Sequence, residues 1–187
     1  MEWVVIVVTI AIVVFVVQVF NNLVRMRNVV REGWSGIDVQ LRRRTDLVPN
    51  LVETVKGYAA HERGLFEDVT RHRAASIAAS DVGGQATAER ALAGSLDRLM
   101  AVAEAYPQLK ASKNFLELQA QLALVEDQLQ MARRYYNGAV RNLNTSIQSF
   151  PELILARLLG FKEQPFFEIE DRAQAQAPQV AFPAGKP

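Results

Sequence analysis

The chain of 187 residues contains no cysteine, only two histidines and almost no excess of either charge. Without cysteine, the protein has neither disulfide bonds nor thiolate metal sites nor a cysteine nucleophile. The 21 Lys and Arg residues against 20 Asp and Glu residues give a net charge of +1. A dedicated nucleic-acid binder is usually strongly basic, so we predict no nucleic-acid partner.

Sequence motifs for catalysis are also missing, including a phosphate-binding loop, a dinucleotide fingerprint and a nucleophile elbow. On a helix His61 and His72 would share a face but lie roughly 16 Å apart, too far to bind one metal ion. Neither histidine follows a glutamate by three residues, as a di-iron bundle requires. We therefore predict no enzymatic activity, no catalytic residues, no metal, no cofactor and no small-molecule substrate.

A long apolar run occupies the N-terminal end of the sequence. No charged residue occurs from Trp3 to Val24, and a helix of this length extends roughly 33 Å, enough for a hydrocarbon core of about 30 Å. A signal peptide would have a basic start, a shorter run and a small-residue cleavage site, which this sequence lacks. We predict that residues 1–24 carry a retained transmembrane anchor, with lipid-facing Trp3, Ile6, Ile10, Val14 and Phe20.

Positive charges follow the apolar run directly, at Arg25, Arg27 and Arg31. Basic residues favour the cytoplasmic side of a membrane, so we predict a single-pass cell-membrane protein with its N-terminus outside and its C-terminal part in the cytoplasm. The three arginines are candidate contacts for lipid headgroups, and the lipid bilayer is the first predicted partner.

Heptad spacing of apolar residues predicts one long helix from Asn114 to Phe150. The apolar positions advance in steps of three and four with one stutter at Tyr136: Phe115, Leu118, Leu122, Val125, Leu129, Ala132, Tyr136, Val140, Leu143, Ile147 and Phe150. Asn114 with Glu117 resembles an N-cap, and Pro151 ends the run. Such a stripe is usually the core of a bundle, so we expect Leu122→Asp to destabilise the protein severely.

A second periodic run extends over residues 37–69 but contains Pro49. Asp46 or Asn50 is a candidate cap for a new helix start, so we predict a bend at residues 46–50. Gly57 and Gly64 would share one helical face, which indicates a close approach to a neighbouring backbone.

The third predicted helix spans residues 86–106, after a turn at residues 81–84 and before Pro107. Short connections between long helices favour antiparallel packing. We therefore predict an all-α protein, with the transmembrane helix followed at residues 25–160 by an antiparallel bundle of three or four long helices. An extended tail, residues 161–187, holds Phe161, Phe166, Phe167 and Phe182, which we expect to pack partly on the bundle.

The densest basic cluster is Arg42, Arg43 and Arg44. It is a candidate interaction cluster for anionic lipid or an acidic partner. The ordinary alternative is a solvated face whose arginines pair with acids of neighbouring helices.

The segment from Trp34 to Glu62 resembles the signature of the LemA family. Further matching segments are residues 103–111, 115–122, 132–137, 149–151, 160–161 and 166–168, so the resemblance covers nearly the whole chain. The residues that it singles out as structural are Trp34, Asp38, Asp46, Pro49, Asn50, Tyr58, His61, Glu62, Tyr106, Pro107, Tyr136, Asn137, Phe150 and Pro151.

The resemblance implies an N-terminally anchored helical bundle without established enzymatic activity, and it suggests a role in shaping or organising membranes. Family genes also tend to accompany membrane quality-control proteases. We therefore expect a non-enzymatic bacterial scaffold that self-associates into a homo-oligomer at the membrane. The alternative is an adaptor or regulator of another membrane protein, such as a quality-control protease, docking through Arg42–Arg44 or the aromatic tail.

Overall fold

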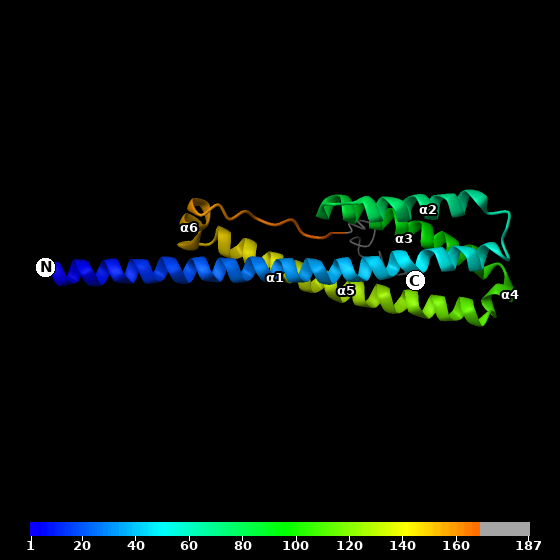
Figure 1. The fold of residues 1–187 in the computed structure, drawn as a ribbon, viewed down its shortest axis with the longest axis horizontal. Helices are drawn as coiled ribbons and strands as arrows, with labels where there is room; N and C mark the ends of the chain where they lie inside the picture. The colour runs from blue at the N-terminus through cyan, green and yellow to red at the C-terminus, as the bar shows by residue number, and fades with distance from the viewer. Residues whose placement is uncertain (169–187) are drawn as a thin grey trace, which may run out of the picture.

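The computed structural model describes residues 1–168. All of the regular secondary structure in this range is helical, and no strand occurs in it. Figure 1 shows the six helices, which confirm the predicted all-α class. Their bounds are α1 Glu2–Lys56, α2 Arg63–Ala78, α3 Val82–Glu104, α4 Pro107–Lys110, α5 Lys113–Gln148 and α6 Glu152–Leu158. Phe182 lies outside the described residues.

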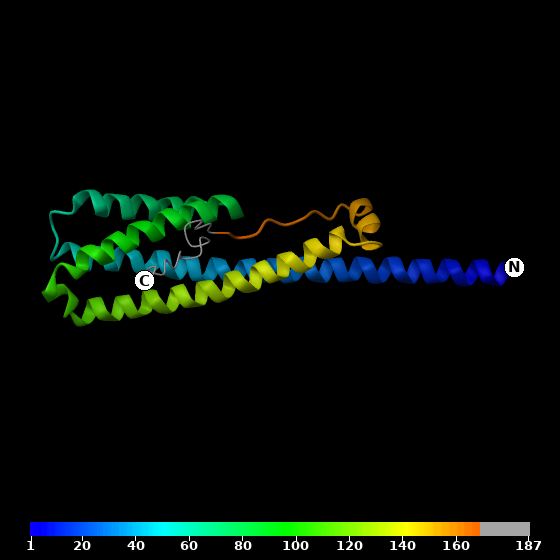
Figure 2. The same ribbon diagram turned by 180° about the vertical axis from the view of Figure 1, so that it is seen from behind.

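The helices form a long rod built around α1 and α5, which run side by side in opposite directions (Figures 1 and 2). The helices α2 and α3 pack together and lie beside the far end of α1, away from the N-terminus. The short α6 and the extended residues 161–168 lie on the part of the rod nearer the N-terminus. Two hydrophobic cores follow from this arrangement, one at each end of the α1–α5 pair.

The heptad stripe of α5 supplies much of both cores. Val125, Leu129, Tyr136, Val140 and Leu143 are buried, whereas Phe150, at the end of the predicted stripe, is 80% exposed. The helix begins at Lys113 after Ser112, so Asn114 lies inside the helix and the predicted Asn114 cap is wrong.

Helix α1 continues through Pro49 without a break, so the predicted new helix start at residues 46–50 is wrong. Proline cannot donate to the carbonyl four residues earlier, which here belongs to Thr45. Arg73 of α2 supplies the missing donor, with its Nε 2.6 Å from the Thr45 carbonyl oxygen. Val48 and Leu51 beside the proline are buried, and their packing offsets the cost of about 3 kcal/mol for an internal proline.

The close approach between backbones occurs at Gly33 rather than at the predicted glycine pair. Gly57 follows the last residue of α1, and a methyl group added at Gly64 would meet nothing within 4 Å. A Cβ atom at Gly33 would lie 3.0 Å from the Cα of Tyr136 on α5. The prediction for Gly57 and Gly64 is wrong because the chain turns between them: Gly57 follows the end of α1, and Gly64 lies in α2.

Helix α3 begins four residues before its predicted start, because Asp81 caps it by accepting a hydrogen bond from the Gly84 amide at 2.9 Å. Tyr106 is extended, as the following Pro107 requires. The chain then makes the single turn of α4 before α5 begins, which brings α5 back along α1.

Candidate functional site

The first part of α1 stands clear of the rest of the molecule. No side chain from residue 3 to residue 18 is buried, and the first buried ones are Val19 and Leu23. This is the one helix among the described residues that is long and apolar enough to cross a membrane. The predicted anchor side chains Trp3, Ile6, Ile10, Val14 and Phe20 are all exposed, although Phe20 also contacts the ring of Phe161 edge-on at 6.1 Å between ring centres.

The three arginines after the apolar run differ in their surroundings. Arg25 and Arg31 are exposed, whereas Arg27 is half-buried and its guanidinium lies 5.3 Å from the centre of the Phe161 ring. A cation over an aromatic face is attracted to it, so Arg27 also fastens residues 161–168 to α1. The prediction that these arginines contact lipid headgroups remains a prediction.

Two asparagines of α5, one heptad apart, hold the extended segment 161–168 against the bundle. Asn137 accepts from the Phe167 amide at 2.9 Å and donates to the Phe167 carbonyl at 3.2 Å. Asn144 makes the same pair of bonds with Gln164, both at 2.9 Å. Each side chain thus satisfies a backbone donor and acceptor that a strand would otherwise pair.

We call Asn137 and Asn144 the asparagine clamp. An aromatic cluster lies beside it. Trp34 packs on Tyr136 and on the buried Phe167, with ring centres 5.6 and 5.7 Å away. The Tyr136 hydroxyl donates to the Pro165 carbonyl at 2.8 Å. Sequence reasoning named Trp34, Tyr136 and Asn137 but missed Asn144, although its spacing of seven residues from Asn137 was a signal.

The three arginines of the predicted interaction cluster do not form one surface. Exposed Arg42 pairs with Asp38 at 3.0 Å, and exposed Arg43 donates to Gln128 of α5 at 3.2 Å. Arg44 points into the bundle and is buried. The inclusion of Arg44 in a docking cluster is therefore wrong, because the heptad pattern of α1 turns it toward the core.

Buried Arg44 is the centre of a polar cluster that joins α1, α2, α3 and α5. Its Nη1 donates to Glu89 at 2.9 Å, and its Nε lies 2.8 Å from Glu126, without the alignment of a hydrogen bond. Glu89 is fully buried and also accepts from Ser76 and from Gln85. The cluster places two carboxylates near the Arg44 guanidinium, and the charge of Arg133 also acts on both of them.

The pKa of Glu126 is raised from its ordinary value of 4.5, chiefly by burial and further by Glu89, against the opposing effect of Arg44 and Arg133. The folded protein therefore holds this proton more tightly than the unfolded chain does. As the pH rises from about 4.5 through the pKa of the folded state, Glu126 lowers the free energy of unfolding.

We expect Glu126→Gln to remove this part of the pH dependence. The free energy of unfolding of the full-length variant, measured between acidic and neutral pH, should then fall less steeply with rising pH than that of the unmodified protein. Asp127→Asn, at the exposed neighbouring position, is the matched control and should retain the original slope. Parallel curves for Glu126→Gln and the unmodified chain would contradict the assignment.

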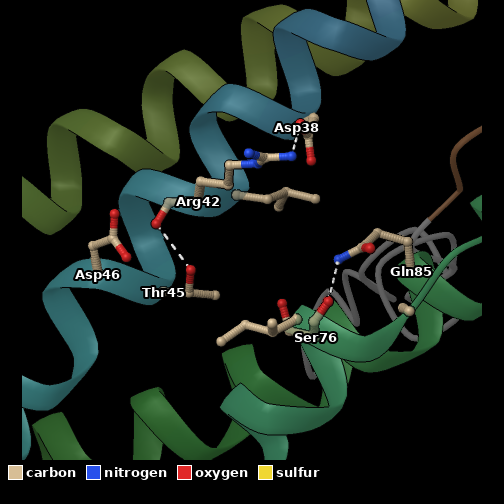
Figure 3. Close-up of a pocket in the computed structure, with 9 residues that line it drawn as sticks. Asp38, Arg42, Thr45, Asp46, Ser76 and Gln85 are labelled. Atoms are coloured by element: carbon tan, nitrogen blue, oxygen red, sulfur yellow. Dashed lines mark hydrogen bonds and ion pairs between the residues drawn. The ribbon is translucent and has the colours of Figure 1, made fainter.

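A hollow of about 380 Å³ opens between α1 and the ends of α2 and α3 (Figure 3). Asp38, Arg42 and Asp46 line it from α1, and Ser76 and Gln85 from the opposite side. Arg42 is already paired with Asp38, and Gln85 donates to the Ser76 carbonyl at 3.2 Å. Four of these five polar side chains lie on residues that are paired with one another across the hollow's lining: Asp38 with Arg42, and Ser76 with Gln85.

The remaining signature residues are spread along the rod. Tyr58 and His61 are exposed in the α1–α2 connection at its far end. Among the described residues, no group of three or more His, Asp and Glu is placed to hold a metal ion. The other positions are Glu62 before α2, Pro49 and Asn50 on α1, Tyr106 between α3 and α4, Pro107 at the start of α4, and Phe150 and Pro151 between α5 and α6.

The sequence is similar to that of known bacterial proteins. Magnetosome protein MamQ 2 of Paramagnetospirillum magneticum (strain ATCC 700264 / AMB-1) is 26% identical in an alignment that covers 80% of this chain and 64% of that protein. Magnetosome protein MamQ of Magnetospirillum gryphiswaldense (strain DSM 6361 / JCM 21280 / NBRC 15271 / MSR-1) is 26% identical over 79% of this chain and 64% of its own length. Protein LemA of Metamycoplasma hominis (strain ATCC 23114 / DSM 25592 / NBRC 14850 / NCTC 10111 / PG21) is 25% identical over 81% of this chain and 69% of its own length.

The chain thus spans slightly less than two thirds of the length of the MamQ proteins. These relatives and the exposed apolar helix fit a membrane-associated protein. A family model described as LemA family matches residues 33–182, most of the sequence. The resemblance carried by the segment from Trp34 to Glu62 is therefore confirmed, and the chain belongs to the LemA family.

Proposed function

We propose that this protein is a single-pass membrane scaffold without enzymatic activity, which self-associates and organises or shapes the bacterial membrane. One observation carries the proposal: α1 is a single helix that leads from an exposed apolar span into the core of the rod. Because no loop separates the two parts, the span and the rod share one axis. Arg25, Arg27 and Arg31 support a cytoplasmic position for the rod.

Self-association is supported by an apolar stripe on the outer face of α5, formed by Leu124, Met131 and Tyr135. These side chains are 58%, 54% and 51% exposed, and their spacing places them within about 40° of one another around the helix. The core residue Leu129 lies on a different side of α5. Single exposed apolar residues are common, but an aligned set of large ones often marks a contact surface.

The geometry of a shared bilayer favours a second copy as the partner of this stripe. Two anchored copies stand parallel, with their stripes at the same height above the membrane. A twofold axis along the membrane normal then brings each stripe against its equivalent. Confinement to one membrane raises the effective concentration, so a small contact area is sufficient.

We expect Met131→Cys to form disulfide-linked dimers when native membranes, isolated at native expression, are treated with copper phenanthroline as the oxidant, because cytoplasmic thiols stay reduced in the cell. The chain has no cysteine of its own, so each introduced thiol is unique. The matched control is Gln130→Cys, which is exposed but points about 100° away around α5. Adding Tyr135→Gln to Met131→Cys should reduce the dimer fraction.

Absence of dimers, or equal yields at positions 130 and 131, would overturn the stripe as the self-association surface. Crosslinking of Met131→Cys only to a different membrane protein would instead support the adaptor role. The structure gives that role less support, because Arg44 is buried and Phe167 is held against the bundle.

A further inference from the structure

The corner between α5 and α6 exposes a patch of apolar side chains. Phe150 and Leu158 are each 80% exposed, and Ile154 and Leu159 are also exposed. Ile154 and Leu158 are four residues apart and therefore share one face of α6. We call these four residues the corner patch.

The opposite side of α6 is apolar as well. Ala156 is buried in the hydrophobic core that includes Val19 and Leu23 of α1, and Leu155 packs against the same core. Only Glu152 and Arg157 carry charge among the seven residues of α6. A helix that is apolar on all sides is normally buried, in protein or in lipid, yet the corner patch is covered by no residue of the described chain.

The place of α6 along α1 indicates what covers the patch. The Phe161 amide donates to the Ala156 carbonyl at 2.9 Å, and the Phe161 ring contacts Phe20, so α6 lies beside the last turns of the apolar run. Figures 1 and 2 show α6 beyond the end of α5, on the side toward the N-terminus.

Lengths along α1 also place α6 at the level where the membrane would end. Only residues 3–18 stand clear of the bundle, and at 1.5 Å per residue they extend about 24 Å. The hydrocarbon core is about 30 Å thick, so the free part of α1 alone is too short to cross it. The part of the hydrocarbon core that residues 3–18 do not cross would be crossed by Val19–Leu23 of α1, and α6 lies beside these residues.

We propose that the corner patch inserts into the boundary between headgroups and acyl chains of the leaflet from which α1 emerges. The inference rests on the proposed membrane anchor and adds a second, peripheral contact with the same bilayer. Exposed Arg25, Arg157 and Lys162 lie next to this level and provide cations for lipid phosphates. Two contacts fix the rotation of the rod about its axis, which a single helix does not.

Environment-sensitive probes on single introduced cysteines test the proposal in the full chain. The protein is reconstituted into phosphatidylcholine–phosphatidylglycerol vesicles, and a fluorophore is attached in turn at Ile154→Cys, Leu158→Cys, Val8→Cys and Leu116→Cys. Position 8 reports on the anchor, and position 116 is an exposed leucine on α5, far from the corner patch and outside the self-association stripe. Quenchers attached to lipid chains are compared with iodide in the water.

We expect lipid-borne quenching and loss of iodide quenching at positions 154, 158 and 8, with the reverse at position 116. Quenching by lipid at position 8 but by iodide at 154 and 158 would overturn the corner insertion and leave the anchor standing. Probes at 154 and 158 shielded from both quenchers would show a protein partner on the patch and would also overturn it. Iodide quenching at position 8 would overturn the anchor and the insertion together.

Discussion

Replacing Arg44 by methionine is expected to lower the free energy of unfolding by about 3–5 kcal/mol, the usual loss when one partner of a buried ion pair is removed. Within residues 1–168, the arginine is the only cation that forms an ion pair with fully buried Glu89, and it also approaches Glu126. Methionine preserves much of the volume but leaves the Glu89 carboxylate with only the donors from Ser76 and Gln85. Urea unfolding of the full chain in detergent measures the loss.

Arg43→Met is the matched control, because Arg43 is exposed and donates only to Gln128. We expect it to change stability by no more than about 0.5 kcal/mol, as exposed substitutions usually do. Where Arg44→Met alone prevents folding, the pair Arg44→Met with Glu89→Leu should restore a cooperative transition, since replacing both charges removes the unpaired carboxylate. Equal stabilities of the Arg43 and Arg44 variants would refute the importance of the buried pair.

Leu129→Asp is expected to lower the stability by more than about 3 kcal/mol, because it places a charge without a partner in the core. Leu129 is 1% exposed, in the core that includes Ile37 and Leu41 of α1. Loss of the cooperative thermal transition, followed by circular dichroism, is the expected result.

Leu116→Asp provides the control on the same helix, since Leu116 is exposed and lies outside the self-association stripe. It should melt close to the unmodified chain. The position chosen from the sequence alone, Leu122, is half-buried, so Leu122→Asp should fall between the two. Matching melts for the variants at 116 and 129 would show that the heptad stripe of α5 is not core.

The sequence predicts the long helices well because the spacing of apolar residues that indicates each helix lies within that helix. In α5 the apolar spacing identifies Val125, Leu129 and Tyr136, and the structure buries all three. Continuity through Pro49 was not predictable in this way, because the donor that satisfies Thr45 is Arg73, 28 residues distant in the chain.

The polar cluster around Arg44 was likewise not predictable from neighbouring residues in the sequence. Three consecutive arginines look like a solvated patch, and only the tertiary fold shows that Glu89, 45 residues away, receives Arg44. The asparagine clamp lies between these cases. The spacing of Asn137 and Asn144 was visible, but the backbone that they bind is a segment without regular secondary structure.

The unbroken course of α1 past Pro49 has a mechanical consequence. A helix of 55 residues is about 82 Å long, and its packing against α5 and α3 stiffens the part beyond the bilayer. On the proposed membrane anchor, thinning of the lipid around the span is expected to tilt such a helix. Because α1 is continuous, the same tilt angle would displace the connection at Tyr58 laterally by more than it displaces residues near the membrane.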